Sequence, residues 1–565
     1  MPTLNIDQSY LAWIQERHGI VHDPSRLSAE LPLLGTDISI CDASTLEVEI
    51  FPNRPDLLCA ETLAYAIRPF IHEQDAQPSL KVVDGDISIS VDASLADVRP
   101  VILGAVVRGV DVGQTEEQKQ QFIKSLMEHQ EKLHFALGRG RRRASIGVHD
   151  LSALAPPFKV ITVARDYSFT PLAKTEEMTI DEILKEHPKG IDYAHLLDGM
   201  ETVPIILDAN NAVLSFPPII NGNHTTVNVS STDFFIDVTG WDERACEACL
   251  QLVCLQLSDR GGSVETVRIS PCTGTEFSSP DPTPLNHEVA RSLVSEILGW
   301  DFSNEEISTA IRRMGGQFLG GDELLQFAMP RWRFDILHPI DIVEDLAIGH
   351  GYDDLPNSQP EISMPGEPHP NAMMGRRVRE CLQGLGLQQV QSLTLSNEAD
   401  QFTNVHWEPD GESTIIINPI TTEHTMLRQS ILPSLLRLIA SNRHHELPQS
   451  IYESGHCVRS HENTSRAAWL VADHKAGFSK ARGFAQILLR DLGAESESVT
   501  WEVVADGEGP WLTGRGARIK IDGQIIGEFG ELDPSVSEKY ELSVPMHGGE
   551  FDLDALRIAI PDPVL

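Results

Sequence analysis

The sequence of 565 residues lacks a long hydrophobic run. A membrane span needs about 20 consecutive apolar residues, and no uncharged window of the chain approaches that length. The first residues, MPTLNIDQSYLAWIQ, lack the basic and then apolar order of a signal peptide. We therefore expect a soluble, cytoplasmic protein that does not engage a membrane.

Cysteine and basic residues are also scarce. The eight cysteines are scattered, and only Cys246 and Cys249 form a CxxC, on the apolar face of a helix expected between Trp241 and Gly261. This favours reduced, buried cysteines over a zinc or redox site. Lysine and arginine number 44 against 83 acidic residues, a net charge of −39. Such a charge suits a salt-rich cytosol, and any RNA contact then needs local basic clusters.

Motifs for nucleotide or nucleophile chemistry are missing. The chain has no GxxxxGK[ST] loop, no GxGxxG after a strand, no GxSxG elbow and no HExxH helix. The chain itself is therefore not expected to carry a nucleotide-binding or nucleophilic centre.

Two segments rich in proline, serine and threonine, 273–286 and 355–371, divide the chain into three blocks. Residues 101–112 predict a strand, and Thr115 and Gln118 form a capping box for the long helix that follows. We expect an α+β multidomain protein. Its predicted domains are an N-terminal α/β domain (1–114), a second domain (115–274), a winged-helix-like domain (275–355) and an α+β domain with an antiparallel sheet (356–565).

The patterns in the last two blocks predict individual elements. Asn286 is expected to cap one helix, and Ser303 and Glu306 form a capping box for another, followed by the strand-like segments LLQFAM and RWRFDI. Two helices with a small sheet are typical of winged helices, which occur as DNA-binding modules and as bare scaffolds. Residues 413–420 predict a strand, and Pro433 begins a helix.

Four carboxylates gather in WRFDILHPIDIVEDL. A helix that begins at Pro339 places Asp341, Glu344 and Asp345 on one face, and Asp335 lies just before it. Like charges at this spacing repel by a few tenths of a kcal/mol per pair, roughly, and oxygen ligands without His or Cys select magnesium or calcium. Acidic residues near a helix start also complement its dipole, so spacing alone leaves both readings open.

The strongest positive cluster lies in GRGRRRASIGVHDL, where glycines allow the backbone to approach a phosphate. A solvated loop is the alternative. His149 and Asp150 in this segment form either a proton-handling pair or ordinary hydrogen-bonded structure. The arginines of this segment are Arg139, Arg141, Arg142 and Arg143.

A third candidate site lies in LSFPPIINGN and FFIDVTG. Asp237 and Thr239 end a strand where a helix begins, so they either cap that helix or face a small-molecule pocket at its N-terminus. Ser215 and Asn221 flank a double proline that fixes the path of the loop.

These segments, in this order, resemble the β subunits of phenylalanyl-tRNA synthetases of the archaeal and eukaryotic type. The resemblance runs nearly end to end, through EIFPNRPDLLCAETLA, GRGRRRASIGVHDL, LSFPPIINGN with FFIDVTG, RWRFDI…DIVEDLAIGHGYD, LRQSILPSLLRLIASN and IGEFGELDP. It implies an (αβ)2 heterotetramer with a catalytic α subunit, which binds ATP and joins phenylalanine to tRNA(Phe).

The resemblance also implies two sites in this chain. One holds magnesium, shared with the α subunit, at Asp335, Asp341, Glu344 and Asp345. The other is an editing pocket that hydrolyses tyrosyl-tRNA(Phe) with a positioned water, because a second site that bonds the extra hydroxyl can select it. The editing residues carried over by motif are Leu207, Ser215, Asn221, Asp237 and Thr239, with the four arginines close to the tRNA end.

The resemblance further implies that residues 115–274 form an editing domain and that residues 356–565 form a degenerate class II synthetase core. This core lacks an arginine in a glycine-rich context that could bind the phosphates of ATP. Adenylation is therefore assigned to the partner, and this domain is expected to form the subunit interface. Two other functions stay open from the residues alone. One is a winged-helix nucleic-acid-binding scaffold, although its second helix offers only Arg312 and Arg313, and the other is a metal-dependent phosphodiesterase.

Overall fold

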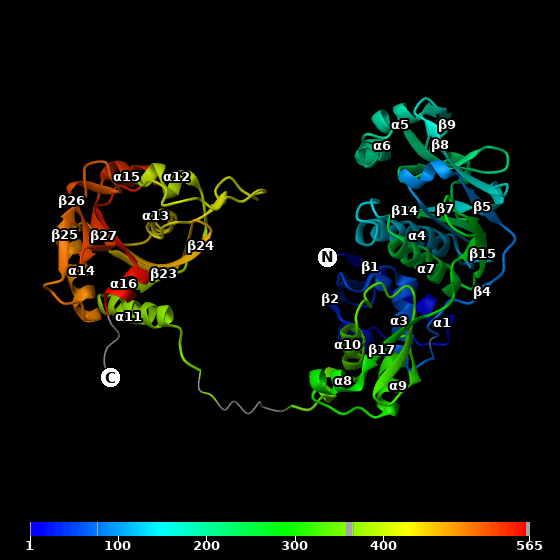
Figure 1. Cartoon of the computed structure of the whole chain (residues 1–565), viewed down its shortest axis with the longest axis horizontal. Helices are drawn as coiled ribbons and strands as arrows, with labels where there is room; N and C mark the ends of the chain where they lie inside the picture. The colour runs from blue at the N-terminus through cyan, green and yellow to red at the C-terminus, as the bar shows by residue number, and fades with distance from the viewer. Residues whose placement is uncertain (1, 76, 358–363, 365, 561–565) are drawn as a thin grey trace. The chain divides into compact units, whose positions relative to one another are not determined.

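The chain forms two compact units, residues 1–359 and 360–565. They are shown in Figure 1, coloured from the N-terminus to the C-terminus, in a computed structural model. The residues that the structure describes are 2–75, 77–357, 364 and 366–560. Within these ranges, no helix combines the length and the apolarity that crossing a bilayer requires.

The first unit opens with a three-stranded antiparallel sheet in the order β1-β3-β2. Asp7 starts the first helix, because its carboxylate accepts the backbone N–H groups of Ser9 and Tyr10. Every second residue of β3 is buried and packs with α3 in one core. The elements are β1 (Thr3–Asp7), α1 (Gln8–Glu16), α2 (Pro24–Glu30), β2 (Thr36–Cys41), β3 (Thr45–Ile50) and α3 (Ala60–His72).

An 11-stranded sheet forms the centre of this unit. Its main path runs β13-β12-β11-β8-β5-β15-β6-β14-β7, with β4 and β16 also paired to β15. The strands β4 to β6 precede residue 114, so the sheet extends across the domain boundary that the sequence predicts there. The strands are β4 (Val82–Val83), β5 (Ser88–Val91), β6 (Val101–Arg108), β7 (Ala144–Asp150), β8 (Phe158–Ala164), β11 (Thr202–Leu207), β12 (Val213–Phe216), β13 (Ile220–Asn221), β14 (Phe234–Gly240), β15 (Ser263–Ser270) and β16 (Phe277–Ser279).

Helices cover this sheet, and the hairpin of β9 (Ser168–Phe169) and β10 (Met178–Thr179) adds a small separate sheet. The predicted capping box of Thr115 and Gln118 is confirmed at the start of the longest helix. The helix predicted between Trp241 and Gly261 is also confirmed, and the two cysteines of its CxxC, Cys246 and Cys249, are buried and form no disulfide. The helices are α4 (Glu116–Ala136), α5 (Ile180–Glu186), α6 (Pro188–Tyr193) and α7 (Glu243–Asp259).

Side chains alternate along strand β14 between the face that packs against helices and the opposite face of the sheet. Phe234, Ile236 and Val238 join the core with α4 and α7, so the alternating residues Asp237 and Thr239 face the other side of the sheet. The cap of α7 is Asp242, whose side chain accepts the N–H of Ala245. The reading of Asp237 and Thr239 as helix caps is therefore wrong, because both lie within the strand.

The third predicted domain begins with a strand and not with a helix. Residues 285–290 form a strand that pairs along its length with β19, so the cap predicted at Asn286 is wrong. The strand predicted for RWRFDI is wrong, since this segment forms turns, in which the backbone N–H of Arg333 donates to the carbonyl of Pro330. The capping box of Ser303 and Glu306 is confirmed. The elements are β17 (Leu285–Ala290), α8 (Arg291–Leu298), α9 (Asn304–Arg313), β18 (Gln317–Gly320), β19 (Leu324–Met329) and α10 (Pro339–His350), with sheet order β17-β19-β18.

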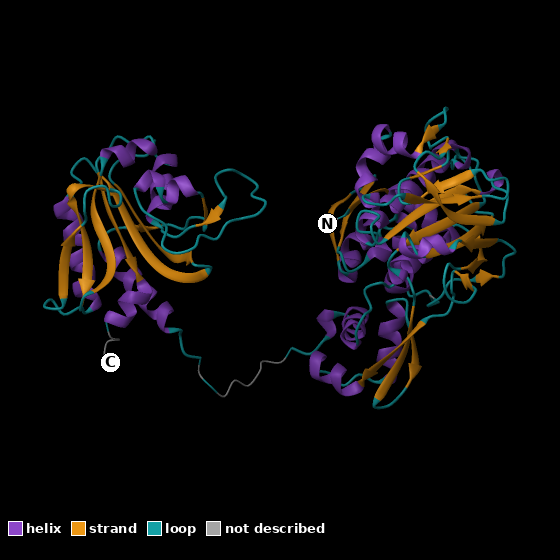
Figure 2. Cartoon of the chain, turned by 45° about the horizontal axis from the view of Figure 1, so that its top comes forward, coloured by secondary structure: helices purple, strands orange, loops and turns teal. Residues whose placement is uncertain are grey.

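The second unit is a seven-stranded sheet in the order β20-β23-β24-β28-β27-β26-β25, antiparallel except for the pair β20 and β23. Figure 2 shows its long strands curving together, with helices on both sides. Alternation along β24 explains the layers, because Trp469 packs with α11, α14 and α16, whereas Leu470 packs with α13. The strands are β20 (Gln388–Gln389), β23 (Gln449–Arg459), β24 (Glu462–Ala472), β25 (Val499–Val503), β26 (Trp511–Ile521), β27 (Gln524–Leu532) and β28 (Met546–Asp552).

The remaining elements of this unit include the helix predicted from Pro433, which is confirmed. The strand predicted over 413–420 is wrong, since only Ile415 forms a bridge, to Met426. The predicted linker 355–371 lies partly outside the described residues. The elements are α11 (Pro370–Gly384), β21 (Leu395–Ser396), α12 (Glu398–Gln401), β22 (Met426–Leu427), α13 (Leu432–Ser441), α14 (Phe478–Leu492), α15 (Pro534–Lys539) and α16 (Leu553–Ala559).

Candidate functional site

A cavity of about 280 Å³ lies where the two ends of the large sheet meet. Strand β7 is one edge of the sheet and β13 is the other, and residues of both line the cavity. The side-chain amide of Asn221, on β13, donates to the carbonyl of Val148, on β7, over 3.5 Å. The sheet therefore curls until its edges enclose a pocket, and α4 closes one side.

Three of the five predicted pocket residues line this cavity: Ser215, Asn221 and Asp237. The Ser215 hydroxyl donates to the amide oxygen of Asn221 over 3.4 Å, across the β12–β13 pair. Leu207 and Thr239 do not line it. Leu207 packs in the core beneath the cavity.

Thr239 is instead held by Arg99, a buried residue that the sequence did not single out. The guanidinium of Arg99 donates to the hydroxyl of Thr239 over 2.8 Å and to its carbonyl over 2.7 Å. It also donates to the Ser145 hydroxyl at 3.1 Å. Burial lowers the pKa of Arg99 to about 10. Arg99 thus ties β14 to β7 behind the cavity.

Asp237 is bonded to His149, and both side chains are buried. The distance from His149 Nε2 to Asp237 Oδ2 is 2.7 Å, and His149 Nδ1 lies 2.8 Å from the Thr225 hydroxyl. Of the two alternatives for His149 and Asp150, the proton-handling pair is therefore not formed. Asp150 accepts hydrogen bonds from Ser152 and Ser231 instead.

The arginine-rich segment splits into buried and exposed members. Arg141 is buried and closes the cavity wall, where it donates to the carbonyls of Pro218 and Ile219 and to Glu131. The neighbouring His134, together with the charge of Arg141, lowers the pKa of Glu131 to about 2 against the effect of burial. The side chains of Arg139, Arg142 and Arg143 are exposed on the turn after α4.

The four carboxylates of the acidic cluster do not share one environment. The guanidinium of Arg333 bonds Asp335 at 2.6 Å and Asp345 at 2.8 Å. Despite the opposing effect of burial, Arg333 keeps the pKa of Asp335 below its usual range. Asp341 points away and accepts the backbone N–H groups of Leu337 and His338, which fixes the start of α10.

The metal site expected from this cluster is matched only in part. Asp335, Glu344 and Asp345 line one cavity, together with Arg54 and Arg333. Oδ2 of Asp345 is buried without a hydrogen-bond partner, and Glu344 is exposed. Among the described residues, however, no three Asp, Glu, His or Cys side chains converge as metal ligands. In this chain the positive charge between Asp335 and Asp345 is an arginine.

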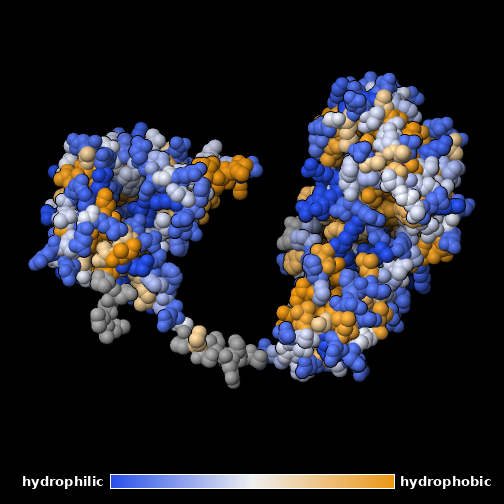
Figure 3. Space-filling view, viewed as in Figure 1, coloured by the Kyte–Doolittle hydropathy of each residue, from blue (hydrophilic) through white to orange (hydrophobic). Residues whose placement is uncertain are grey.

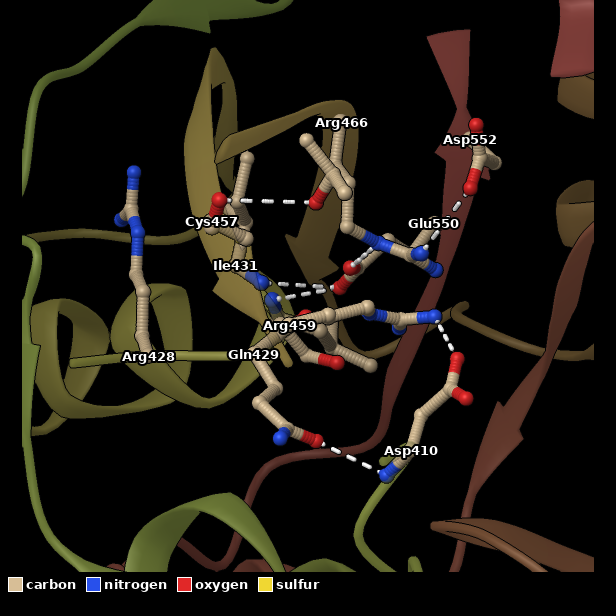
Figure 4. Close-up of polar contacts among 12 residues, drawn as sticks. Asp410, Arg428, Gln429, Ile431, Cys457, Arg459, Arg466, Glu550 and Asp552 are labelled. Carbon is tan, nitrogen blue, oxygen red and sulfur yellow. Dashed lines mark hydrogen bonds and ion pairs between the residues drawn. The ribbon is translucent and has the colours of Figure 1, made fainter. Parts of the chain in front are cut away.

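The second unit has arginines on its sheet, but carboxylates of the same unit pair with them (Figure 4). Arg466 contacts Glu550, whose second oxygen accepts the N–H groups of Ile431 at 3.0 Å and Leu432 at 2.9 Å, at the start of α13. Arg428, which follows β22, bonds Glu453 of β23 at 2.6 Å. Arg459, which Figure 4 shows directed at Asp410, is paired as well. A phosphate would have to displace these carboxylates.

Sequence reasoning missed Arg99, Glu131, Gly147 and Thr225 as residues of the site. A signal for one of them was present in ASIGVHD, since alternation puts Ser145, Gly147 and His149 on one face of a strand. The strand partner that places this face against Asp237 was not predictable, because register depends on the tertiary fold.

Three family models match successive parts of the chain. They are the B3/4 domain over residues 98–253, the tRNA synthetase B5 domain over 287–352, and the phenylalanyl tRNA synthetase beta chain CLM domain over 355–553. Their order along the chain follows the order of the large sheet, the small β17–β19 domain and the second unit.

Curated relatives match nearly the whole chain. The phenylalanine–tRNA ligase beta subunit of Archaeoglobus fulgidus is 39% identical over 547 residues, which cover 96% of this chain and 98% of the relative. That of Methanococcoides burtonii is 37% identical over 533 residues, covering 94% and 96%. A crystal structure of an N-terminal fragment of the phenylalanyl-tRNA synthetase beta-subunit from Pyrococcus horikoshii is 28% identical with a TM-score of 0.57, and covers 62% of this chain and 100% of the fragment.

Proposed function

Because this chain belongs to the phenylalanine–tRNA ligase β-subunit family, we propose two roles for it. One is a scaffold role in ligation, and the other is hydrolytic editing of tyrosyl-tRNA(Phe). As a β subunit it is a component of the synthetase that forms phenylalanyl-tRNA, with an α subunit as its partner. The editing proposal rests above all on Asp237, a buried carboxylate that lines a cavity large enough for an amino-acid side chain.

Adenylation in this proposal belongs to the α subunit, which binds ATP. The arginines of the second unit support this assignment. The guanidinium groups that could bind a triphosphate, those of Arg428 and Arg466, are already paired with Glu453 and Glu550. The alternative function, a winged-helix scaffold that binds nucleic acid, also loses support because the two arginines of its second helix already have partners within the chain. Arg312 pairs with Asp75, and Arg313 donates to the carbonyls of Phe70 and Gly349.

A partner surface is suggested by apolar side chains between β21 and β22. Ile417 and Ile420 are 92% and 99% exposed, and Ile415 is 62% exposed. Figure 3 shows apolar colour at the projecting end of this unit. Exposed apolar clusters of this kind mark protein contacts, so we place part of the α-subunit contact of an (αβ)2 heterotetramer here.

The editing step is ester hydrolysis inside the cavity. A phenolic hydroxyl donates to Asp237, and Ser215 and Asn221 offer further polar contacts. Water adds to the ester carbonyl and releases tyrosine and tRNA(Phe), with the geometry supplied by the pocket, since none of its side chains is an activated nucleophile. The exposed Arg139, Arg142 and Arg143 contact the tRNA phosphates near the cavity mouth.

Magnesium is assigned to the cavity of Asp335, Glu344 and Asp345. Among the described residues of this cavity, the Glu344 carboxylate and Oδ2 of Asp345 accept no hydrogen bond from the protein. The α subunit supplies the remaining ligands. When bound, the ion would add positive charge beside Glu344 and the free oxygen of Asp345, and we expect it to strengthen the subunit contact. Calorimetric titration of the heterotetramer with Mg²⁺ tests this: Glu344→Ala weakens binding at least tenfold, whereas Glu323→Ala on the β18–β19 hairpin does not.

Charging assays test the ligation proposal. The purified chain alone is expected to form no phenylalanyl-tRNA, and addition of the matching α subunit restores charging. Charging by the chain alone would refute the assignment of adenylation to the partner.

Single-turnover hydrolysis of preformed tyrosyl-tRNA(Phe) by the heterotetramer tests editing. Asp237→Ala is expected to slow hydrolysis at least tenfold with phenylalanine charging retained, because the two chemistries use separate sites. Equal hydrolysis by the wild type and Asp237→Ala would remove this cavity from editing.

A further inference from the structure

The pair of His149 and Asp237 is built by the register between β7 and β14. Asp237 lies opposite Gly147, so His149 stands on the same face, two residues along the neighbouring strand. Both side chains are buried, and the imidazole lies 2.7 Å from one carboxylate oxygen, Oδ2. Within the described residues, His149 is the hydrogen-bond partner of the Asp237 carboxylate. The other oxygen, Oδ1, is thus left for whatever enters the cavity.

His149 is held at both ring nitrogens. Nε2 faces Oδ2 of Asp237, and because an ionised carboxylate only accepts, Nε2 carries the hydrogen of this bond. Nδ1 lies 2.8 Å from the Thr225 hydroxyl, which itself lies 3.1 Å from the carbonyl of Gly222. The imidazole is therefore fixed with its Nε2–H directed at Oδ2.

Space for this arrangement depends on Gly147. A Cβ atom on Gly147 would lie 2.0 Å from Asp237 Oδ2 and 2.7 Å from His149 Nε2. Both distances are shorter than any real carbon contact, so a side chain here is incompatible with the pair. Gly147 therefore provides the space, and His149 the hydrogen bond, that hold one carboxylate oxygen of Asp237 on the neighbouring strand.

We propose that His149 is a positioning residue for the editing pocket: it holds Oδ2 of Asp237 so that Oδ1 alone accepts the phenolic hydroxyl of a tyrosyl ester. This inference rests on the editing function proposed above and adds the residue that sets its selectivity. A fixed acceptor is pre-organised for a single donor, which tyrosine has and phenylalanine lacks. The N–H of His149 also gives one oxygen of this buried carboxylate a hydrogen-bond partner.

The test is single-turnover hydrolysis of tyrosyl-tRNA(Phe) and phenylalanyl-tRNA(Phe) by the heterotetramer, with the ratio of the two rates as the readout. His149→Ala is expected to lower this ratio at least tenfold, whereas His149→Gln, whose amide still donates to Oδ2, recovers part of the loss. A general loss of structure would lower both rates and phenylalanine charging together. The matched control is His129→Gln, which changes a buried histidine that bonds Gln256 away from the cavity.

The outcomes separate the inference from the function on which it rests. If His149→Ala is poorly folded, Thr225→Val decides, since it removes the hydroxyl partner of Nδ1 and is expected to lower the same ratio. A ratio within twofold of the wild type in a folded His149→Ala or Thr225→Val protein overturns the role of His149 and leaves editing intact. Equal hydrolysis by the wild type and Asp237→Ala overturns both.

Discussion

At the scale of single residues, this chain uses small and charged side chains to fix other side chains in place. Gly147 leaves room for the pair of His149 and Asp237. Arg333 lies between Asp335 and Asp345. In each case a residue that touches no ligand decides which atoms of a carboxylate remain available.

Replacement of Gly147 by alanine tests the close approach. Because the new Cβ overlaps Oδ2 of Asp237, we expect tyrosyl-tRNA(Phe) hydrolysis to fall at least tenfold and phenylalanine charging to persist. Single-turnover hydrolysis measures the effect. Gly483→Ala, where nothing lies within 4 Å of the added carbon, is the control. Wild-type hydrolysis by Gly147→Ala would show that the pair tolerates a shift.

Replacement of Arg333 by methionine tests the central cation of the acidic cluster. It leaves two carboxylates buried without their shared partner, which costs about 3–5 kcal/mol of the free energy of unfolding. Urea unfolding measures this loss. Arg312→Ala breaks an exposed ion pair with Asp75 and should change stability by less than about 1 kcal/mol. Similar values for the two variants would mean that Arg333 is not the essential cation there.

At the scale of elements, buried histidines join helix α4 to the sheet and to helix α7. His134 Nε2 accepts the backbone N–H of Ile146, on β7, over 2.8 Å, and His129 bonds Gln256 of α7. Burial lowers the pKa of both histidines to about 4. A proton on His134 Nε2 would break its bond to the strand that forms one wall of the cavity.

This arrangement predicts acid sensitivity. Between pH 4 and pH 6.5 the unfolded chain binds protons that the folded histidines exclude, so the free energy of unfolding falls as pH falls through this window. Thermal unfolding at a series of pH values should show a shallower slope for His134→Gln than for the wild type. His195→Gln, at an exposed histidine of the same unit, should keep the wild-type slope. Parallel slopes for all three proteins would contradict the prediction.

At the scale of the whole molecule, the main features are the net charge and the exposed apolar surface. The net charge of −39 means that self-repulsion opposes the compact state, while individual ion pairs such as Arg466 with Glu550 hold it locally. Exposed isoleucines near β22 leave apolar surface on a chain that is otherwise strongly polar. Both features suit a subunit that works in a salt-rich solution with a partner.

Salt should therefore stabilise the chain. Screening shortens the reach of repulsion to about 3 Å at 1 M salt, so the melting temperature is expected to rise from about 0.05 M to about 1 M KCl. Calorimetry of the isolated chain measures this, with sucrose at matched osmolality as the control for solute effects. A melting temperature that falls with KCl would show that the ion pairs outweigh the net repulsion.

The sequence by itself determined the family, the helix starts at Thr115 and Ser303, and the strand and helix that flank Asp242, because these signals are local in the chain. Three of the five residues that the resemblance assigns to the editing pocket line one cavity. Only the tertiary structure decided that 285–290 pairs as a strand, because β19 supplies its hydrogen bonds. The partners of the charged groups were likewise beyond the sequence. His149 meets Asp237, 88 positions away, because strand register sets the contact, and Arg333 reaches Asp345 because the chain turns back at residue 336.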